Sequence, residues 1–313
     1  MSSRHGFGAT DVGLLVMALI WGINYSVVKV GLQAIPPLAF NGLRMLLAAT
    51  VLSLLSFWLR RDRWPVRRDV IHLLLLGLIG NGLYQMCFIL GLARTRAGIA
   101  ALVTAAGPAY IAIISQLLGR DRTTRTGWLA IALQLLGVAC VVRSTHALEG
   151  GESALVGTVL IACGSILWAL FSVLLRPYTE RAHPIHLSAI TMASGASFLL
   201  LLAAPTLRTL DLHAVRPVEW GAVLYAGLGA LVIAYLLFYR GVQQLGPTRT
   251  AMYSNLQPVI ALAVAWIALH EQPSGWQLIG ASCIMAGLLL SRFTGNRPRA
   301  VADSSSTSTT TTV

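Results

Sequence analysis

Ten apolar stretches limit the fold of this chain more than any other feature. Each is close to the roughly 20 residues that a membrane-spanning helix needs. Only 11% of all residues are charged, against roughly 25% in soluble domains. We therefore predict an all-α polytopic membrane protein with ten transmembrane helices, at residues 12–34, 37–59, 70–92, 97–118, 125–143, 154–175, 185–204, 219–241, 248–269 and 275–292.

One segment of the chain occurs twice. Residues 101–123 read ALVTAAGPAYIAIISQLLGRDRT, and residues 251–273 read AMYSNLQPVIALAVAWIALHEQP. An offset of 150 pairs Pro108 with Pro258 and Asp121 with Glu271. Each copy belongs to a block of five apolar stretches, and an odd number of spans makes the second block enter the membrane from the opposite side. The sequence therefore predicts two inverted five-helix repeats, as in many secondary transporters.

The basic residues predict the orientation of these spans. With the N-terminus inside, 16 arginines fall in cytoplasmic segments and five in the opposite loops. Because basic residues accumulate on the cytoplasmic side, both termini are predicted to be cytoplasmic. The net charge of +12 thus reflects membrane topology, and we predict no nucleic acid partner.

These patterns divide the chain into five parts. We predict a cytoplasmic N-terminus at 1–11, a first five-helix repeat at 12–143, a link at 144–153, a second five-helix repeat at 154–292 and a tail at 293–313. The tail is polar and of low complexity, which predicts disorder. A single lysine among many arginines is typical of GC-rich bacteria, which suggests the bacterial cytoplasmic (inner) membrane. The oligomeric state stays open, and a monomer would suffice.

Pro108 and Pro258 interrupt two of the apolar stretches. Each proline lacks an amide hydrogen and so frees the carbonyl four residues earlier, that of Thr104 or Ser254. A spanning helix tolerates this where neighbours or cavity water satisfy the freed carbonyl. We predict a kink at each proline. A hinge and a static packing kink are equally open interpretations.

Several motifs resemble the ten-span branch of the drug/metabolite transporter superfamily, the EamA-like transporters. The resemblance covers residues 12 to 292 and rests on Trp21, Gly22, Asn24 and Lys29, on Arg44, and on the paired prolines. Where the family ends two helices with a small-Gly-Glu-Arg-like turn, this chain departs from the pattern but keeps an acid each time, Asp121 and Glu271. The resemblance implies helices around a central cavity and export or exchange of small metabolites, often amino acids.

Lys29 is the only lysine, and Arg44 is the only arginine deep inside a predicted span. A cation near the bilayer centre costs about 2.5 to 3.5 kcal/mol on insertion scales, so it usually faces a polar interior. Both cations fall in the outer half, where they could bind a substrate carboxylate. Snorkelling is the alternative for Lys29, and capping of helix-end carbonyls is the alternative for Arg44. No Asp or Glu lies centrally in a span, which argues against cationic substrates.

The other candidate substrate-binding residues are polar or aromatic side chains on the implied cavity helices. They are Trp21, Asn24, Tyr25, Asn81, Tyr84, Gln85, Trp168, Tyr235, Tyr253, Asn255 and Gln257. Aromatic faces beside amide and hydroxyl groups are typical of small-molecule sites. They suit a neutral or zwitterionic substrate with an apolar part. Interfacial anchoring is the alternative for any single tryptophan or tyrosine.

The sequence argues against other functional classes. A Walker A loop needs Gly-Lys, whereas Val28 precedes the only lysine. His183 and His186 lie near Glu180, but no cysteine or further acid completes a metal site. Without an arranged nucleophile, base and orienting acid, we predict no enzymatic activity, metal or cofactor.

We therefore predict a secondary transporter that exports amino acids or related compounds by alternating access. Its partners would be a small-molecule substrate and the lipid bilayer. Nucleobases, sugars and drug-like solutes are alternative substrates, and a channel-like facilitator is an alternative mechanism. Transport direction, and proton coupling as opposed to exchange or facilitated diffusion, stay open.

Overall fold

The computed structural model describes residues 8–58, 64–149, 152–293 and 297–298. This part of the chain is helical, apart from the two-residue strands β1 (Asp121–Arg122) and β2 (Arg297–Pro298), which pair antiparallel. The predicted all-α class is confirmed. The predicted N-terminus at 1–11 and tail at 293–313 lie outside the described residues, except for 8–11, 293 and the two residues of β2.

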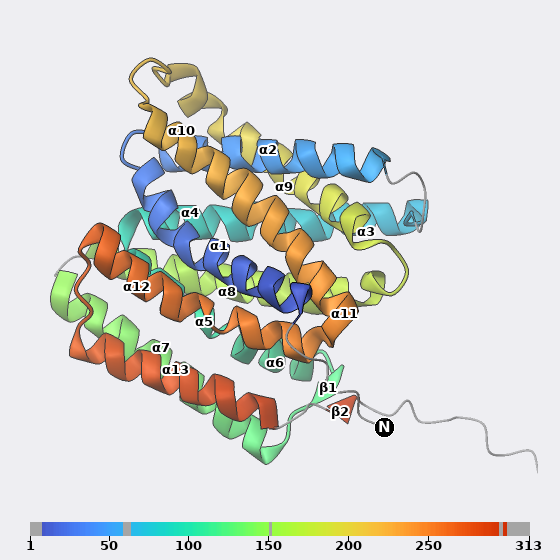
Figure 1. Cartoon of the computed structure of the whole chain (residues 1–313), viewed down its shortest axis with the longest axis vertical. Helices are drawn as coiled ribbons and strands as arrows, with labels where there is room; N and C mark the ends of the chain where they lie inside the picture. The colour runs from blue at the N-terminus through green and yellow to red at the C-terminus, as the bar shows by residue number, and fades with distance from the viewer. Residues whose placement is uncertain (1–7, 59–63, 150–151, 294–296, 299–313) are drawn as a thin grey trace, which may run out of the picture.

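The helices form one bundle (Figure 1). Two stretches of wider π-helix, η1 and η2, join α3 to α4 and α10 to α11. The helical elements are α1 (Ala9–Gly31), α2 (Pro37–Trp58), α3 (Arg67–Gly77), η1 (Leu78–Leu83), α4 (Tyr84–Arg94), α5 (Ala97–Ala105), α6 (Gly107–Leu117), α7 (Arg125–Glu149), α8 (Glu152–Thr179), α9 (Pro184–Thr209), α10 (Pro217–Leu224), η2 (Tyr225–Ile233), α11 (Ala234–Ser254), α12 (Gln257–Leu269) and α13 (Gly275–Phe293).

Nine helical segments of the described chain are long and apolar enough to cross a membrane, and a shorter apolar helix covers Gly275–Ser291. Large apolar side chains also cover the outside of the bundle: Phe57 is 80% exposed and Ile267 is 72% exposed. Exposing so much apolar surface to water is unfavourable, whereas lipid can cover it. Helices suit lipid because they satisfy their own backbone hydrogen bonds. The chain is therefore a multi-pass membrane protein.

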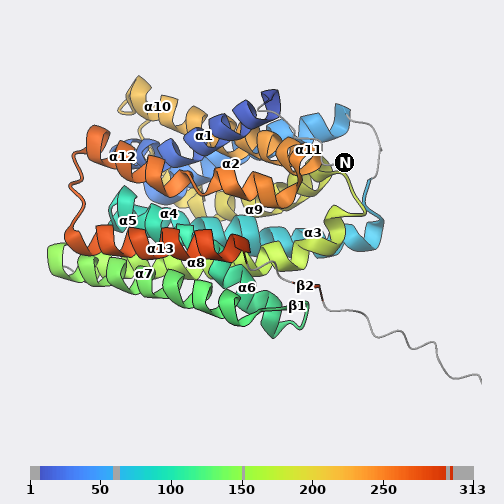
Figure 2. The ribbon, with the colours of Figure 1, turned by 60° about the horizontal axis from the view of Figure 1, so that its bottom comes forward.

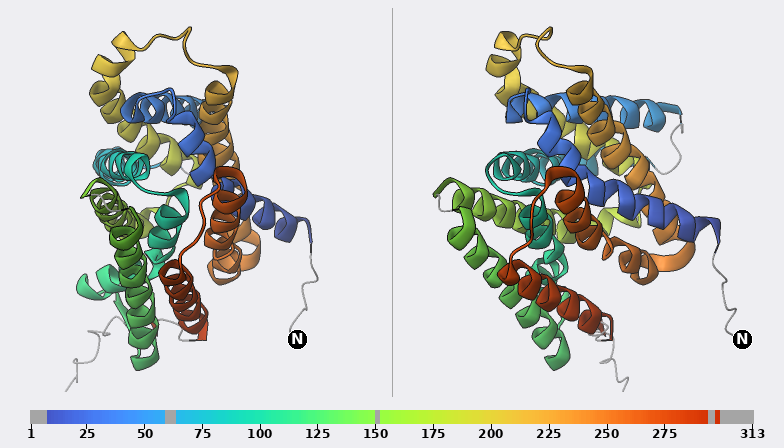
Figure 3. Two further views of the ribbon diagram at one scale, coloured as in Figure 1. Left: turned by 90° about the vertical axis from the view of Figure 1, so that its left-hand side faces the viewer. Right: turned by 60° about the vertical axis from the view of Figure 1, so that its left-hand side comes forward.

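Helices distant in sequence pack closely where small residues meet. Figures 2 and 3 show α7 and α13 side by side along one flank of the bundle. A Cβ added to Gly137 of α7 would lie 2.6 Å from the Gly280 carbonyl oxygen of α13. Only glycine permits this approach, and such small-residue contacts hold membrane helices together. Similar close pairs join α2 to α9 and α4 to α8.

Several helices extend beyond the predicted boundaries, and two of them, α7 and α11, replace predicted connections. Because α7 continues to Glu149 and α8 begins at Glu152, most of the predicted link at 144–153 is helical. Helix α11 likewise runs to Ser254, through the connection predicted near residues 242–247. The hydropathy of the sequence marks only the apolar part of a helix. Polar turns can continue the helix into the headgroup region, where side chains reach water.

The two proline-bearing helices are interrupted, so the predicted kinks are confirmed. Helix α5 ends at Ala105 and α6 begins at Gly107, whereas α11 ends at Ser254 and α12 begins at Gln257. Pro108 and Pro258 each lie in the first turn of the second helix. The missing N–H of proline costs no helical hydrogen bond at that position. A hinge at these breaks stays a prediction.

Candidate functional site

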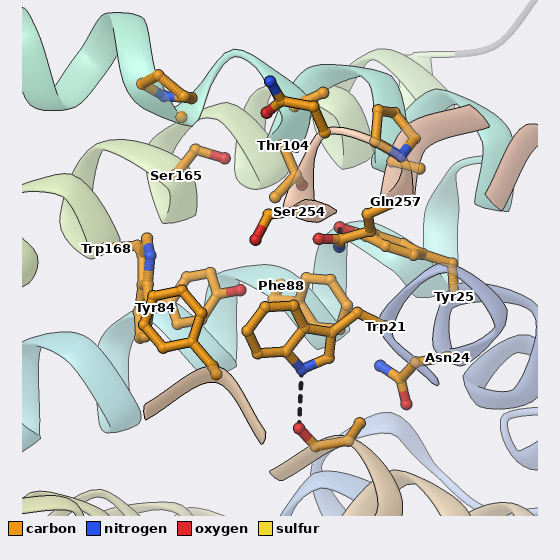
Figure 4. Close-up of a pocket in the computed structure, with 18 of the residues that line it drawn as sticks. Trp21, Asn24, Tyr25, Tyr84, Phe88, Thr104, Ser165, Trp168, Ser254 and Gln257 are labelled. Carbon is orange, nitrogen blue, oxygen red and sulfur yellow. Dashed lines mark hydrogen bonds between the residues drawn. The ribbon is translucent and has the colours of Figure 1, made fainter. Parts of the chain in front are cut away.

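A cavity of about 340 Å³ lies in the bundle beside both helix breaks. Its size falls within the range of small-molecule pockets, roughly 300 to 1,000 Å³. Figure 4 shows that side chains from both halves of the chain point into it. Helices α1, α2, α4, α5 and α6 contribute from the first half, and α8, η2, α11, α12 and α13 from the second.

Most of the predicted substrate-binding residues line this cavity. They are Trp21, Asn24, Tyr25, Arg44, Tyr84, Gln85, Trp168, Tyr235, Asn255 and Gln257, together with both predicted hinge residues, Pro108 and Pro258. The structure thus brings together residues from seven separate elements. Their role in substrate binding stays a prediction.

Lys29, Asn81 and Tyr253 lie outside the lining of this cavity. Lys29 is in the last turn of α1. The Tyr253 hydroxyl donates instead to Asp11 Oδ1 at 2.6 Å. Asn81 packs its backbone against α9, where a Cβ on Gly195 would lie 2.4 Å from its carbonyl carbon. Each residue lies within a few positions of a lining residue, but the helical twist turns neighbours to different faces.

Arg44 is the one charged residue in the cavity lining of the described chain, and it is only 1% exposed. Its Nε donates to Asn41 Oδ1 at 2.8 Å, and its Nη2 donates to Gln85 Oε1 at 2.7 Å. Asn41 is itself fixed, because its Nδ2 donates to the Gln85 carbonyl oxygen at 2.9 Å. The partners of Arg44 are thus side-chain amides rather than helix-end carbonyls.

These bonds leave Arg44 with unused donor capacity. A guanidinium carries five N–H groups, and the two amide oxygens occupy two of them. Its carbon lies 5.5 Å from the ring centre of Phe88 and 6.0 Å from that of Phe40, a cation–π arrangement. The ion pairs of the described residues join other groups, Arg176 to Asp121 and Arg216 to Glu219. A buried cation with only neutral partners favours an anionic ligand.

Aromatic rings form much of the remaining wall. Trp21 meets Tyr235 edge to face at 5.6 Å, and Trp168 lies 5.1 Å from Tyr84 and 6.4 Å from Tyr235. The Trp21 Nε1 donates to the Ala230 carbonyl oxygen of η2 at 2.9 Å (Figure 4). The rings are therefore held in place and give the cavity a rigid, mainly apolar wall.

Three hydroxyl groups in the lining are absent from the predicted site, those of Thr104, Ser165 and Ser254. The sequence gives no signal for Ser165, because a serine within an apolar stretch is a common helix-packing residue. Thr104 and Ser254 carry a usable signal, since each lies four residues before a paired proline. Phe88 and Phe238 also line the cavity and share the offset of 150.

Histidines, cysteines and acids do not gather in threes anywhere in the described residues, so no group there could hold a metal ion. His186, which the sequence brings near His183, is buried and lies 2.6 Å from the Ser56 hydroxyl. Its ring also packs against Trp64 at 4.7 Å.

Curated relatives match this chain along most of its length. The uncharacterized transporter YyaM of Bacillus subtilis is 26% identical over 284 residues, which cover 88% of this chain and 91% of that protein. A probable amino-acid metabolite efflux pump of Salmonella typhimurium is 29% identical, over 96% of this chain and 99% of that protein. The uncharacterized inner membrane transporter YedA of Escherichia coli K12 is 30% identical, over 82% of this chain and 80% of that protein.

A solved structure and a family model also match this chain. A crystal structure of another protein superposes with a TM-score of 0.62 at 20% identity, covering 90% of this chain and 96% of that one. This likeness shows the fold alone. The model of the EamA-like transporter family matches residues 9–143 and 155–293. Since the matches include nearly all of the described residues, the chain belongs to the EamA-like transporter family.

Proposed function

We propose that this protein is a secondary transporter of the bacterial cytoplasmic membrane that exports amino acids or related carboxylate-bearing metabolites by alternating access. Its ten apolar helices form two inverted five-helix repeats, and both termini lie in the cytoplasm. The offset of 150 between the two broken helices supports the repeat, and the distribution of arginines supports the orientation. The name of YedA as an inner membrane transporter supports the location.

One observation supports a carboxylate-bearing substrate. Arg44 places a buried guanidinium in the cavity wall without a carboxylate partner in the described chain. An entering carboxylate would accept the N–H groups that the amides leave unused, and charged hydrogen bonds of this kind are the strong ones. Cationic drugs would meet a like charge instead. The amino-acid metabolite efflux pump among the relatives favours the same class.

Alternating access is the mechanism that the paired breaks favour. Broken helices at a central cavity recur in carriers whose two repeats move against each other. Nucleobases, sugars and uncharged drug-like solutes would leave the Arg44 charge unmatched.

Counterflow in proteoliposomes tests the proposal. Purified protein would be assayed with each of the twenty L-amino acids, with and without a pH gradient. Saturable uptake with counterflow supports a carrier, whereas flux that does not saturate would indicate a channel. A response to the pH gradient would indicate proton coupling.

The Arg44→Met variant tests the binding role. We expect affinity for carboxylate-bearing substrates to fall at least about 100-fold, since two charge-assisted hydrogen bonds contribute about 1.5 to 3 kcal/mol each. Lys29→Met is the matched control, because it removes a cation that lies outside the cavity lining. Unchanged affinity in a folded Arg44→Met protein would overturn the assignment of this residue.

A further inference from the structure

The serine and threonine hydroxyl groups of the cavity lining, three in number, already donate their hydrogens. Thr104 donates to the Ala100 carbonyl oxygen at 2.8 Å, and Ser165 donates to that of Ile161 at 2.9 Å. Ser254 donates to the Thr250 carbonyl oxygen at 3.5 Å. A hydroxyl has one hydrogen but two lone pairs. Towards a ligand, these oxygens therefore act as acceptors.

Two amide side chains add further acceptor capacity. Gln257 lines the cavity, and its Nε2 donates to the Tyr25 hydroxyl at 3.2 Å, so that its Oε1 is the atom that can accept. Figure 4 shows the Ser254 hydroxyl pointing into the cavity, with Thr104 and Gln257 in the same part of the view. Asn24 also lines the cavity and is 8% exposed, and its buried Oδ1 has no hydrogen-bond donor. An unpaired buried acceptor is destabilising, and a donor on a ligand would offset that cost.

Two of these hydroxyl-bearing residues, Thr104 and Ser254, lie at the helix breaks. Thr104 and Ser254 are equivalent in the repeat, and each precedes its proline by four residues. Because proline has no N–H, their carbonyl oxygens lack the donor that a continuous helix would supply. Each break also places the hydroxyl-bearing residue in the cavity lining.

Arg44 is the chemical opposite of this group. Its guanidinium only donates, and it comes from α2, whereas the acceptor oxygens come from α5, α8, α11 and α12. No Asp or Glu of the described chain lines the cavity. A cationic group would therefore be bound by neutral oxygens, and its charge would have to be balanced within the ligand itself.

We infer that Thr104, Ser165, Ser254 and Gln257 form an acceptor pole that binds the ammonium group of a zwitterionic amino acid. This inference rests on the proposed function, in which Arg44 holds the carboxylate of the same molecule. The two poles select a ligand with both charges. A carboxylic acid without the ammonium group would leave the acceptor pole empty.

Equilibrium binding to the purified full-length protein in detergent tests this inference. The twenty L-amino acids are screened first, and the one that binds most tightly is compared with its deaminated acid, for example leucine with 4-methylpentanoate. We expect the amino acid to bind at least about 10-fold more tightly, since hydrogen bonds from a charged donor are worth about 1.5 to 3 kcal/mol each. Thr104→Val and Ser254→Ala should each weaken amino acid binding about 10-fold and leave the deaminated acid unchanged.

The chain offers a matched control and a rescue. Ser172 lies on α8 like Ser165 and donates to the Trp168 carbonyl oxygen at 2.7 Å, but it lies outside the cavity lining. Ser172→Ala should therefore change neither affinity. Thr104→Ser keeps the hydroxyl and should bind the amino acid as the parent protein does. Retained binding of the deaminated acid also shows that each variant is folded.

The possible outcomes separate this inference from the proposed function. If Thr104→Val and Ser254→Ala change neither affinity, or both affinities equally, the acceptor pole is wrong. The proposed function then still stands, provided that Arg44→Met loses both ligands. If neither amino acids nor deaminated acids bind to the parent protein, the proposed substrate class and the inference fall together.

Discussion

The two acids that end the repeated segment hold very different partners. The Glu271 carboxylate accepts the backbone N–H groups of Ala97 at 2.9 Å and Gly98 at 3.0 Å, so it caps the N-terminus of α5. Asp121, its equivalent 150 residues earlier, accepts from the Ser115 hydroxyl at 2.7 Å and from Arg176 at 3.3 Å. Glu271 thus binds a helix end in the other half of the chain, whereas Asp121 bonds only to side chains in these contacts.

The difference follows from the chain that each acid faces. Arg96 has extended backbone, with φ −69° and ψ 150°, and this leaves the first N–H groups of α5 free to be capped. The equivalent positions in the second half, 247 and 248, lie inside the continuous helix α11. A continuous helix has no free N-terminus there for Asp121. Two similar segments therefore make different contacts, because only one of them faces a helix end.

Removing the Glu271 cap should have the largest effect. We expect Glu271→Ala to lower the free energy of unfolding by about 2 kcal/mol, since two N–H groups lose their acceptor and the helix dipole loses a charge. Asp121→Ala should cost about 1 kcal/mol or less. Thermal unfolding of both variants in detergent measures the difference. Equal losses of unfolding free energy in the two variants would show that Glu271 and Asp121 stabilise the protein equally.

The Ser115→Ala variant tests how much the hydrogen bond from Ser115 to Asp121 contributes to stability. Ser115 is 3% exposed and donates to Asp121 at 2.7 Å. We expect the variant to lose about 1 kcal/mol, the usual contribution of one such hydrogen bond. Ser282→Ala is the control, because the Ser282 hydroxyl is exposed and donates only to its own helix, at Leu278. An effect no larger than that of the control would show that Ser115 contributes little.

Replacing each proline by alanine compares the two helix breaks. In Pro108→Ala and Pro258→Ala, an N–H returns and can re-form a helical bond worth about 1 kcal/mol. If the breaks act as hinges, the variant must break this added bond in each transport cycle. Counterflow should therefore be about 5-fold slower than in the parent protein. The effect should be larger for Pro108, where one residue separates the helices, than for Pro258, where two do. Transport at the parent rate in both folded variants would favour static kinks.

The smallest effect is expected at Arg176. Its side chain is 60% exposed, so its ion pair with Asp121 is screened by water. Arg176→Gln should change the free energy of unfolding by less than about 0.5 kcal/mol, and salt should reduce even that change. A loss comparable to that of Ser115→Ala at low salt would mean that the ion pair, not the serine, fixes the Asp121 end.

Local sequence patterns predict several features of the fold and the site. Both helix interruptions follow from Pro108 and Pro258, because proline cannot donate in a helix wherever it is placed. The polar environment of Arg44 follows from the cost of an isolated charge in lipid. The helical continuation across residues 144–149 is missed, because hydropathy does not distinguish a polar helical turn from a loop.

Other features of the site depend on contacts between distant parts of the chain. Tyr253 and Ser254 are adjacent, yet one bonds to Asp11 and the other lines the cavity. Ser165 joins the cavity only because α8 turns that face towards it. The orientation of a helix about its own axis is set by its neighbours, so no local pattern reveals it.

By itself, the sequence determined that this protein spans a membrane, carries a duplicated segment and breaks two helices at paired prolines. These properties depend on apolar length and on the chemistry of proline, which are local. Only the tertiary structure decided that Arg44 bonds to Asn41 and Gln85, that three serine and threonine hydroxyls share its cavity, and that Glu271 rather than Asp121 caps a helix. Those contacts require helices that are distant in the sequence to pack together, and their energies depend on the final distances.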